Sequence, residues 1–322
     1  MLVEDWRPQI IVDGVQVDNA SANKAVLFRD ADHKYFHRED IVRGSFVSFE
    51  DSKYKFRSPT GMIADFYEKF DTIPEAKKYV KKHKLPITWE QLVFAWEYLG
   101  DFASEAGTLL HGYAEALWND WKMPRPTHLK VPFIEAMMKE LLHNHTLVRT
   151  ELLTYSLHYR LAGQVDLLLK EKFTGNLALM DYKFINELEM KSYFNYQTRK
   201  YKMMSGPFSR LQDCAHNHYS IQMSLYKMLL PKSVRIRVKS KTLLVVSPTG
   251  YELVEGRPMQ LWVDKEGILQ AKYRDGWKRL YNSSEDDLYL QNPYIVVSND
   301  KEEELNSTQK AEKDLLNKIM NI

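Results

Sequence analysis

The sequence predicts an α/β domain with a mixed β-sheet flanked by helices, elaborated at both its N- and C-terminal ends. Three patterns support this fold class. Residues 1–60 alternate short apolar runs with turn residues, which favours strands. From about residue 61 to 122 the apolar residues recur with helical spacing. Residues 161–184 then contain two apolar, strand-type runs joined by a short turn, which predicts a β-hairpin.

The composition excludes several classes of protein. The 322 residues include 45 Lys and Arg against 43 Asp and Glu, so a nucleic-acid surface would have to come from local clustering of charge. A single cysteine, Cys214, excludes internal disulfides and thiolate-rich metal sites. No glycine-rich phosphate loop is present, which argues against an ATPase. Without a secretory leader or an apolar span of about 18 residues, we expect an intracellular, soluble protein with no membrane association, in a bacterial cytoplasm or a nucleus or organelle.

Three helices are predicted before the hairpin. Thr88 can cap the first of them, and Gly100 can end it. The second is expected over 104–120. The third carries Pro132 in its first turn, where proline is favourable. Its apolar residues recur at every fourth position, as in an amphipathic helix: Phe133, Met137 and Leu141.

The remaining elements follow from the same patterns. Strands are expected at 150–157, 241–248 and 250–256, and helices at 217–230 and 267–282. We therefore divide the chain into three parts. These are an N-terminal β-rich segment packed on the core (1–60), a core with helical elaboration (61–298), and a charged tail, either a solvated helix or disordered (299–322).

The hairpin carries two aspartates at matching positions. Asp166 and Asp181 are equally far from the expected turn centre in 173–174, so they should face each other across the strands. Opposed residues have Cβ atoms about 4.5–5.5 Å apart. Two carboxylates at that distance repel each other, so we expect a cation between them. Side chains alternate along a strand, so Asp181 and Lys183 should share a face while Tyr182 points away.

Five further polar residues are candidates for the same site, and each has a simpler explanation. His111 and Glu115 are four residues apart on a helix, so Glu115 could orient the imidazole. Taken alone, a histidine on an apolar helix is more often a core residue, and Glu115 could equally be a surface acid. Gln222 and Tyr226 have the same spacing and could be merely the polar edge of their helix. Glu151 precedes the hairpin and could be a surface charge.

Four short motifs occur in order between residues 105 and 230: Gly-Thr-x-x-His at 107–111, Gly-x-x-Asp at 163–166, Asp-x-Lys at 181–183 and Gln-x-x-x-Tyr at 222–226. In this order and at this spacing they resemble the motifs of RecB-like nucleases, including phage-type exonucleases, in the PD-(D/E)XK superfamily. Asp-x-Lys alone occurs often by chance, whereas four ordered motifs are more specific. The resemblance implies a restriction-endonuclease-like core around the mixed sheet.

The resemblance also implies roles for individual residues. His111, Asp166 and Asp181 would bind a metal ion together with the backbone carbonyl of Tyr182. Lys183 would position or activate the attacking water, so that Asp166, Asp181 and Lys183 are the expected catalytic residues. Oxygen ligands suit Mg²⁺ or Mn²⁺, and an imidazole ligand favours Mn²⁺. Nearby cations would disfavour the ammonium form of the lysine.

Supporting or substrate-contacting roles are expected for Glu115, Glu151, Gln222 and Tyr226. One departure from the family pattern is Phe184, since a threonine is frequent after the lysine.

A basic and aromatic segment follows the hairpin. Cations for phosphates and rings for bases are what a groove for single-stranded nucleic acid needs. The alternative is an ordinary solvated loop. The residues expected to contact nucleic acid are Lys191, Tyr193, Tyr196, Arg199, Lys200 and Lys202.

These observations predict a divalent-metal-dependent DNA nuclease. We expect an exonuclease in recombination, repair or phage DNA processing, acting on linear DNA or single-stranded ends, with a recombination or single-strand-binding protein as partner. One alternative is a structure-specific or RNA-directed endonuclease on the same core. Another is a catalytically inert scaffold that binds nucleic acid, although the intact acid pair and Lys183 argue against it. The sequence leaves the oligomeric state open.

Overall fold

The computed structural model describes most of the chain between residues 10 and 284. The described residues are 10–12, 15–17, 26–29, 34–37, 55–265, 268–273 and 279–284. The chain divides into two compact units, Met1–Glu285 and Asp286–Ile322, and every described residue belongs to the first. The tail predicted at 299–322 therefore lies outside the described residues.

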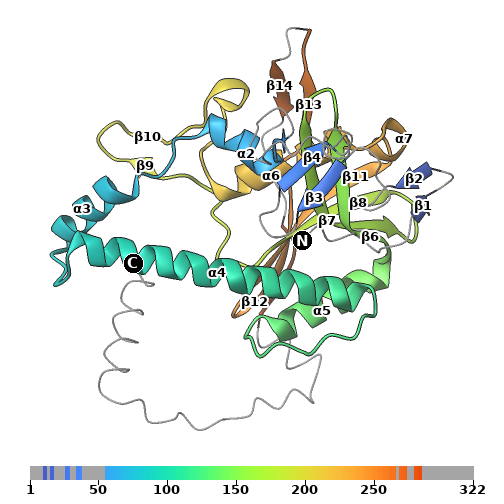
Figure 1. Cartoon of the computed structure of the whole chain (residues 1–322), viewed down its shortest axis with the longest axis horizontal. Helices are drawn as coiled ribbons and strands as arrows, with labels where there is room; N and C mark the ends of the chain where they lie inside the picture. The colour runs from blue at the N-terminus through green and yellow to red at the C-terminus, as the bar shows by residue number, and fades with distance from the viewer. Residues whose placement is uncertain are drawn as a thin grey trace, which may run out of the picture. The chain divides into compact units, whose positions relative to one another are not determined.

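A six-stranded mixed sheet forms the centre of the fold (Figure 1). Its order is β15-β12-β11-β8-β7-β6. β8 and β11 pair in parallel, and their neighbours in the sheet pair antiparallel. The mixed sheet with flanking helices is thus confirmed. The strands are β6 (His145–Ser156), β7 (Leu161–Glu171), β8 (Leu177–Lys183), β11 (Val238–Ser247), β12 (Gly250–Glu255) and β15 (Arg279–Ser284).

Helix α4 (Trp89–Trp118) is one long helix where two were predicted (Figure 1). Its start is as predicted, because Thr88 accepts a hydrogen bond from the backbone of Gln91, whose side chain bonds back to Thr88. The predicted end at Gly100 is wrong. Glycine costs a helix only about 1 kcal/mol, so the hydrogen-bond ladder can continue through it.

The other helices are α2 (Pro59–Ile63), α3 (Thr72–His83), α5 (Val131–Asn144), α6 (Ala215–Leu229) and α7 (Lys232–Arg235), with 3₁₀ turns η3 (Ala64–Phe66) and η4 (Gly206–Phe208). The predictions for α5 and α6 are confirmed, including the buried stripe of Phe133, Met137 and Leu141. Within the described residues, no helix is both long and apolar enough to cross a bilayer.

Short antiparallel strands precede α2. They are β1 (Ile10–Val12), β2 (Val15–Val17), β3 (Val26–Arg29), β4 (Lys34–His37) and β5 (Lys55–Phe56), and they agree with the strands predicted in 1–60. The predicted turn at Asp13 and Gly14 lies outside the described residues. Val26, Tyr35 and Phe56 form one apolar cluster with Leu153 of β6 and Ala162 of β7, so β3, β4 and β5 pack on the central sheet.

The helix predicted at 267–282 is wrong, because this region contains strands β14 (Leu269–Tyr273) and β15. β14 pairs with β13 (Met259–Val263). Every second residue of β14 packs on the cluster that contains Phe208: Leu269, Ala271 and Tyr273. This spacing of two is the one that a strand requires. Tertiary packing thus overrides the local pattern here.

The largest described core cluster lies between α6 and the sheet. Residues of β7, β8 and β11 pack there against Met223 and Tyr226 of α6. Between β8 and α6 the chain forms a small hairpin of β9 (Phe194–Asn195) and β10 (Lys200–Tyr201). The candidate site lies where β7 and β8 carry their acidic residues, next to this core.

Candidate metal centre

The register of the β7–β8 hairpin brings the two aspartates together. The ladder pairs Leu167 with Met180, so the next two residues, Asp166 and Asp181, stand opposite each other. This confirms the predicted register. The backbone N–H of Tyr182 donates a hydrogen bond of 2.7 Å to Oδ2 of Asp166, which ties the carboxylate of one strand to the backbone of the other.

A third acid extends this pair into a row. The β6–β7 ladder pairs the residues on either side of Glu151 and Asp166, so Glu151 stands opposite Asp166 on the other side from Asp181. Adjacent strands lie about 4.8 Å apart. Three carboxylates on β6, β7 and β8 therefore occupy one level of the sheet. From the sequence, Glu151 is expected only in a supporting role, because its pairing depends on the β6–β7 register.

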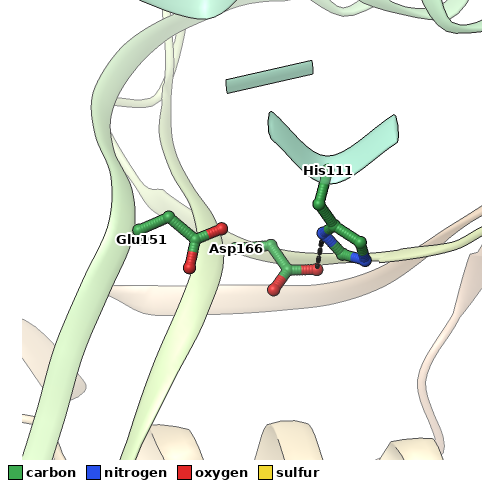
Figure 2. A group of neighbouring side chains, drawn as sticks. All are labelled: His111, Glu151 and Asp166. Carbon is green, nitrogen blue, oxygen red and sulfur yellow. Dashed lines mark ion pairs between the residues drawn. The ribbon is translucent and has the colours of Figure 1, made fainter. Parts of the chain in front are cut away.

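His111, Glu151 and Asp166 form the group that best fits a metal ion (Figure 2). One potential ligand atom from each lies within 4.8 Å of the other two. Nδ1 of His111 is 3.6 Å from Oδ2 of Asp166. All three are half-buried, and they come from α4, β6 and β7. One imidazole and two carboxylates suit a divalent cation such as Mn²⁺ or Mg²⁺.

Glu151 has an unusual backbone conformation. Its φ is +45°, in the left-handed region that residues other than glycine rarely adopt. Such a conformation costs on the order of 1–3 kcal/mol and often marks a functional site. In Figure 2 the Glu151 carboxylate points toward Asp166. The strained backbone thus belongs to a residue whose carboxylate is a potential metal ligand.

Asp181 and Lys183 form an ion pair beside this group. Asp181 is buried, and burial raises the pKa of its carboxyl to about 6. Burial lowers the pKa of Lys183, but the carboxylates of Asp181 and Asp166 outweigh it and hold the pKa above its usual value. Burial also raises the pKa of Asp166, against the opposing effect of Lys183. The expectation that cations disfavour the ammonium form stays a prediction.

The end of β8 presents two different faces, as predicted. Nζ of Lys183 lies 4.6 Å from the ring centroid of Tyr219 on α6. The hydroxyl of Tyr182 instead accepts a hydrogen bond of 2.6 Å from Nε1 of Trp118 on α4. Asp181 lies with Lys183, and it is outside the compact group of His111, Glu151 and Asp166. The role of the Tyr182 carbonyl as a ligand stays a prediction.

Glu115 of α4 contacts the strand that carries Glu151. Its Oε1 accepts a hydrogen bond of 3.2 Å from Thr150, the residue before Glu151. Asn119 also donates to Thr150, at 3.0 Å. Glu115 therefore joins the helix that bears His111 to the strand that bears Glu151. That Glu115 also orients the imidazole of His111 stays a prediction.

Gln222 and Tyr226 form a buried pair under the hairpin. Nε2 of Gln222 donates a hydrogen bond of 2.9 Å to the Tyr226 hydroxyl, and both residues are buried, which excludes a solvated helix edge. Burial raises the pKa of Tyr226 well above its usual value, and the negative charge of Asp181 adds to this. A Cβ at Gly163 would lie 2.7 Å from Cε1 of Tyr226. The glycine of the Gly-x-x-Asp motif thus makes room for this ring.

The β9–β10 hairpin presents most of its predicted nucleic-acid contacts to solvent. Tyr193 and Tyr196 are 71% and 81% exposed. The exposed cations of the hairpin region are Lys191, Arg199 and Lys200. Lys202 differs, because its Nζ lies 3.1 Å from Asp213 and 3.6 Å from Glu68. Its charge is therefore balanced within the protein, and it braces the hairpin.

Two comparisons by sequence find no relative of the chain. No protein-family model matches the chain, and no curated protein matches it by sequence. The resemblance to RecB-like nucleases thus rests on the four motifs.

Proposed function

We propose that this protein is a divalent-metal-dependent nuclease with a PD-(D/E)XK core that hydrolyses phosphodiester bonds in DNA. The observation that carries the proposal is the row of Glu151, Asp166 and Asp181 on three adjacent strands, with His111 and Lys183 beside it. Three carboxylates on adjacent strands repel one another. A cation bound by the row would offset their mutual repulsion.

The residues present fit Mg²⁺ or Mn²⁺. His111, Glu151 and Asp166 would hold the ion, and Asp181 stands next to them. A bound divalent ion would neutralise phosphate oxygens and lower the pKa of the attacking water. Lys183 brings a positive charge to the same end of the hairpin, where it would position that water or stabilise charge on the phosphate.

DNA is the proposed substrate because of the β9–β10 hairpin. It follows the strand that bears Asp181 and Lys183, and it combines exposed tyrosines with exposed cations. Base stacking on such rings is worth about 1–3 kcal/mol per base. We propose exonucleolytic action on linear or single-stranded ends in recombination, repair or phage DNA processing, with a recombination or single-strand-binding protein as partner. An endonuclease on the same core and an inert scaffold are the alternatives.

The test incubates labelled linear, nicked and circular DNA, and RNA, with Mg²⁺, Mn²⁺ or EDTA. The variants are Asp166→Ala and Lys183→Ala, with Glu75→Ala on α3, away from the site, as the control. We expect cleavage of linear DNA that needs metal, is lost in the two site variants and persists in the control. Cleavage of circular DNA or RNA would favour an endonuclease. Metal-independent cleavage, or full activity of both site variants, would refute the mechanism.

Loss of cleavage alone would not separate the inert scaffold from an inactive preparation. Binding of the same DNA is therefore measured by fluorescence anisotropy in parallel. Tight binding with no cleavage under either metal would support the scaffold.

A further inference from the structure

Two aromatic rings at the end of β8 contact the imidazole of His111. Tyr182 and Phe184, called here the ring pair, are two residues apart, so they lie on the same side of the strand. Their planes differ by 9° and their centroids are 5.6 Å apart. The His111 ring meets both edge-on, at 5.8 Å and 89° to Tyr182 and at 5.0 Å and 86° to Phe184. Two nearly parallel surfaces thus fix the plane of the imidazole.

The ring pair is itself held from two other elements. Trp118 of α4 donates a 2.6 Å hydrogen bond to the hydroxyl of Tyr182. Lys130, directly before α5, donates a 2.8 Å hydrogen bond from Nζ to the backbone carbonyl of Phe184. Both donors are buried. The aromatic surface beside His111 is therefore a fixed part of the structure.

Two neighbours of His111 on α4 are glycines. Gly107, one turn before it, and Gly112, directly after it, have no side chains, and a Cβ at either position would meet no atom within 4 Å. Edge-to-face contacts stabilise a pair of rings beyond the burial of their surface. The ring pair therefore supplies orientation that these neighbours on α4 cannot give.

We propose that Tyr182 and Phe184 are positioning residues that hold the His111 imidazole in the orientation needed to bind the metal ion. This inference rests on the proposed function, since it takes His111 to be a ligand. The side chain of Phe184 has no polar group. Its ring would pack against the imidazole of His111 and limit the access of water to it. Groups that hydrogen-bond to ligand histidines typically change metal affinity about 10–100-fold when they are lost, and for ring packing we expect the lower end of that range.

The test measures Mn²⁺ binding directly by isothermal titration calorimetry, without any nuclease assay. Phe184→Leu removes the ring, Phe184→Tyr keeps it, and His111→Ala gives the loss expected when the ligand itself is removed. Phe208→Leu is the matched control, because Phe208 is a buried ring in the separate cluster of η4 and α6. We expect Phe184→Leu to weaken Mn²⁺ binding about tenfold. Phe184→Tyr should bind like the wild type, and Phe208→Leu should lower stability without changing affinity.

The outcomes separate this inference from the proposed function. Wild-type protein that binds no Mn²⁺ would refute the metal centre itself. Wild-type binding with an unchanged affinity in folded Phe184→Leu would refute the ring pair alone, as would equal losses in the Leu and Tyr variants. If Phe184→Leu does not fold, Tyr182→Phe removes only the hydroxyl held by Trp118. A measurable loss of Mn²⁺ affinity in Tyr182→Phe would support the inference. An unchanged affinity in that variant would contradict it.

Discussion

Gly163→Ala tests whether the glycine of the Gly-x-x-Asp motif is required by packing. A Cβ there would lie 2.7 Å from Cε1 of Tyr226 and 2.9 Å from Cδ of Pro59. Real Cβ contacts are essentially never that short, so something must move. Tyr226 is buried and its hydroxyl is bonded to Gln222, while Pro59 is a buried part of α2. Neither ring can move into free space.

We therefore expect overpacking to cost about 1–3 kcal/mol of the free energy of unfolding. The assay is urea unfolding followed by tryptophan fluorescence and circular dichroism, with the midpoint and slope compared with the wild type. Gly100→Ala is the matched control. A Cβ at Gly100 meets no atom within 4 Å in the middle of α4, so this change should stabilise by about 0.5–1 kcal/mol.

A double variant identifies the atoms responsible. Tyr226→Ala alone leaves a cavity, but it also frees the space that a Cβ at Gly163 needs. In the Tyr226→Ala background, Gly163→Ala should therefore cost less than in the wild type, because the two changes share one contact. Equal costs in both backgrounds would show that Tyr226 is not the obstacle. An unchanged unfolding midpoint for Gly163→Ala alone would refute the packing argument.

Three further predictions concern other parts of the chain. Burial holds the pKa of Lys241 at about 7, below its usual 10.5. The unfolded chain then binds more protons between those pH values, so the free energy of unfolding should rise with pH there by up to about 1.4 kcal/mol per unit. Lys241→Met should flatten that rise in urea titrations at pH 7–10. Glu151→Gly should keep or raise stability, because glycine tolerates a φ of +45°, yet weaken Mn²⁺ binding measured by calorimetry; a strongly destabilised variant would show that the strain argument is wrong. Lys200→Ala should weaken binding of a single-stranded oligonucleotide, measured by anisotropy, and reduce the salt dependence of that binding. Lys202→Ala should mainly lower the melting temperature, because Lys202 is paired with Asp213. The reverse pattern would contradict the roles given to the two lysines.

Several parts of the fold could be predicted from residues that lie close together in the sequence. The cap at Thr88 and the proline at the start of α5 depend only on nearby residues. The register of Asp166 and Asp181 followed from their equal distances to a short turn, because a tight hairpin leaves few alternatives. In each case the determining contacts lie close together in the sequence.

Other parts depend on contacts that the sequence does not display. Glu151 joins the acidic row only through the β6–β7 register, which shifts at an irregularity between Leu147 and Arg149. The Trp118–Tyr182 hydrogen bond joins residues 64 positions apart. The strand at Leu269–Tyr273 forms because η4 and α6 offer an apolar surface to pack against. These are tertiary effects, and patterns within one segment do not predict them.

The parallel pairing of β8 with β11 has a consequence for how such a protein can diversify. Parallel neighbours cannot be joined by a tight turn, so the chain must leave β8 at Lys183, cross over the sheet and return at Val238. The β9–β10 hairpin and α6 both lie on that crossover. Insertions within it would alter the β9–β10 hairpin without changing the strands that carry the acidic row. The connection is therefore a part of the fold that can change at little cost to the strands of the acidic row.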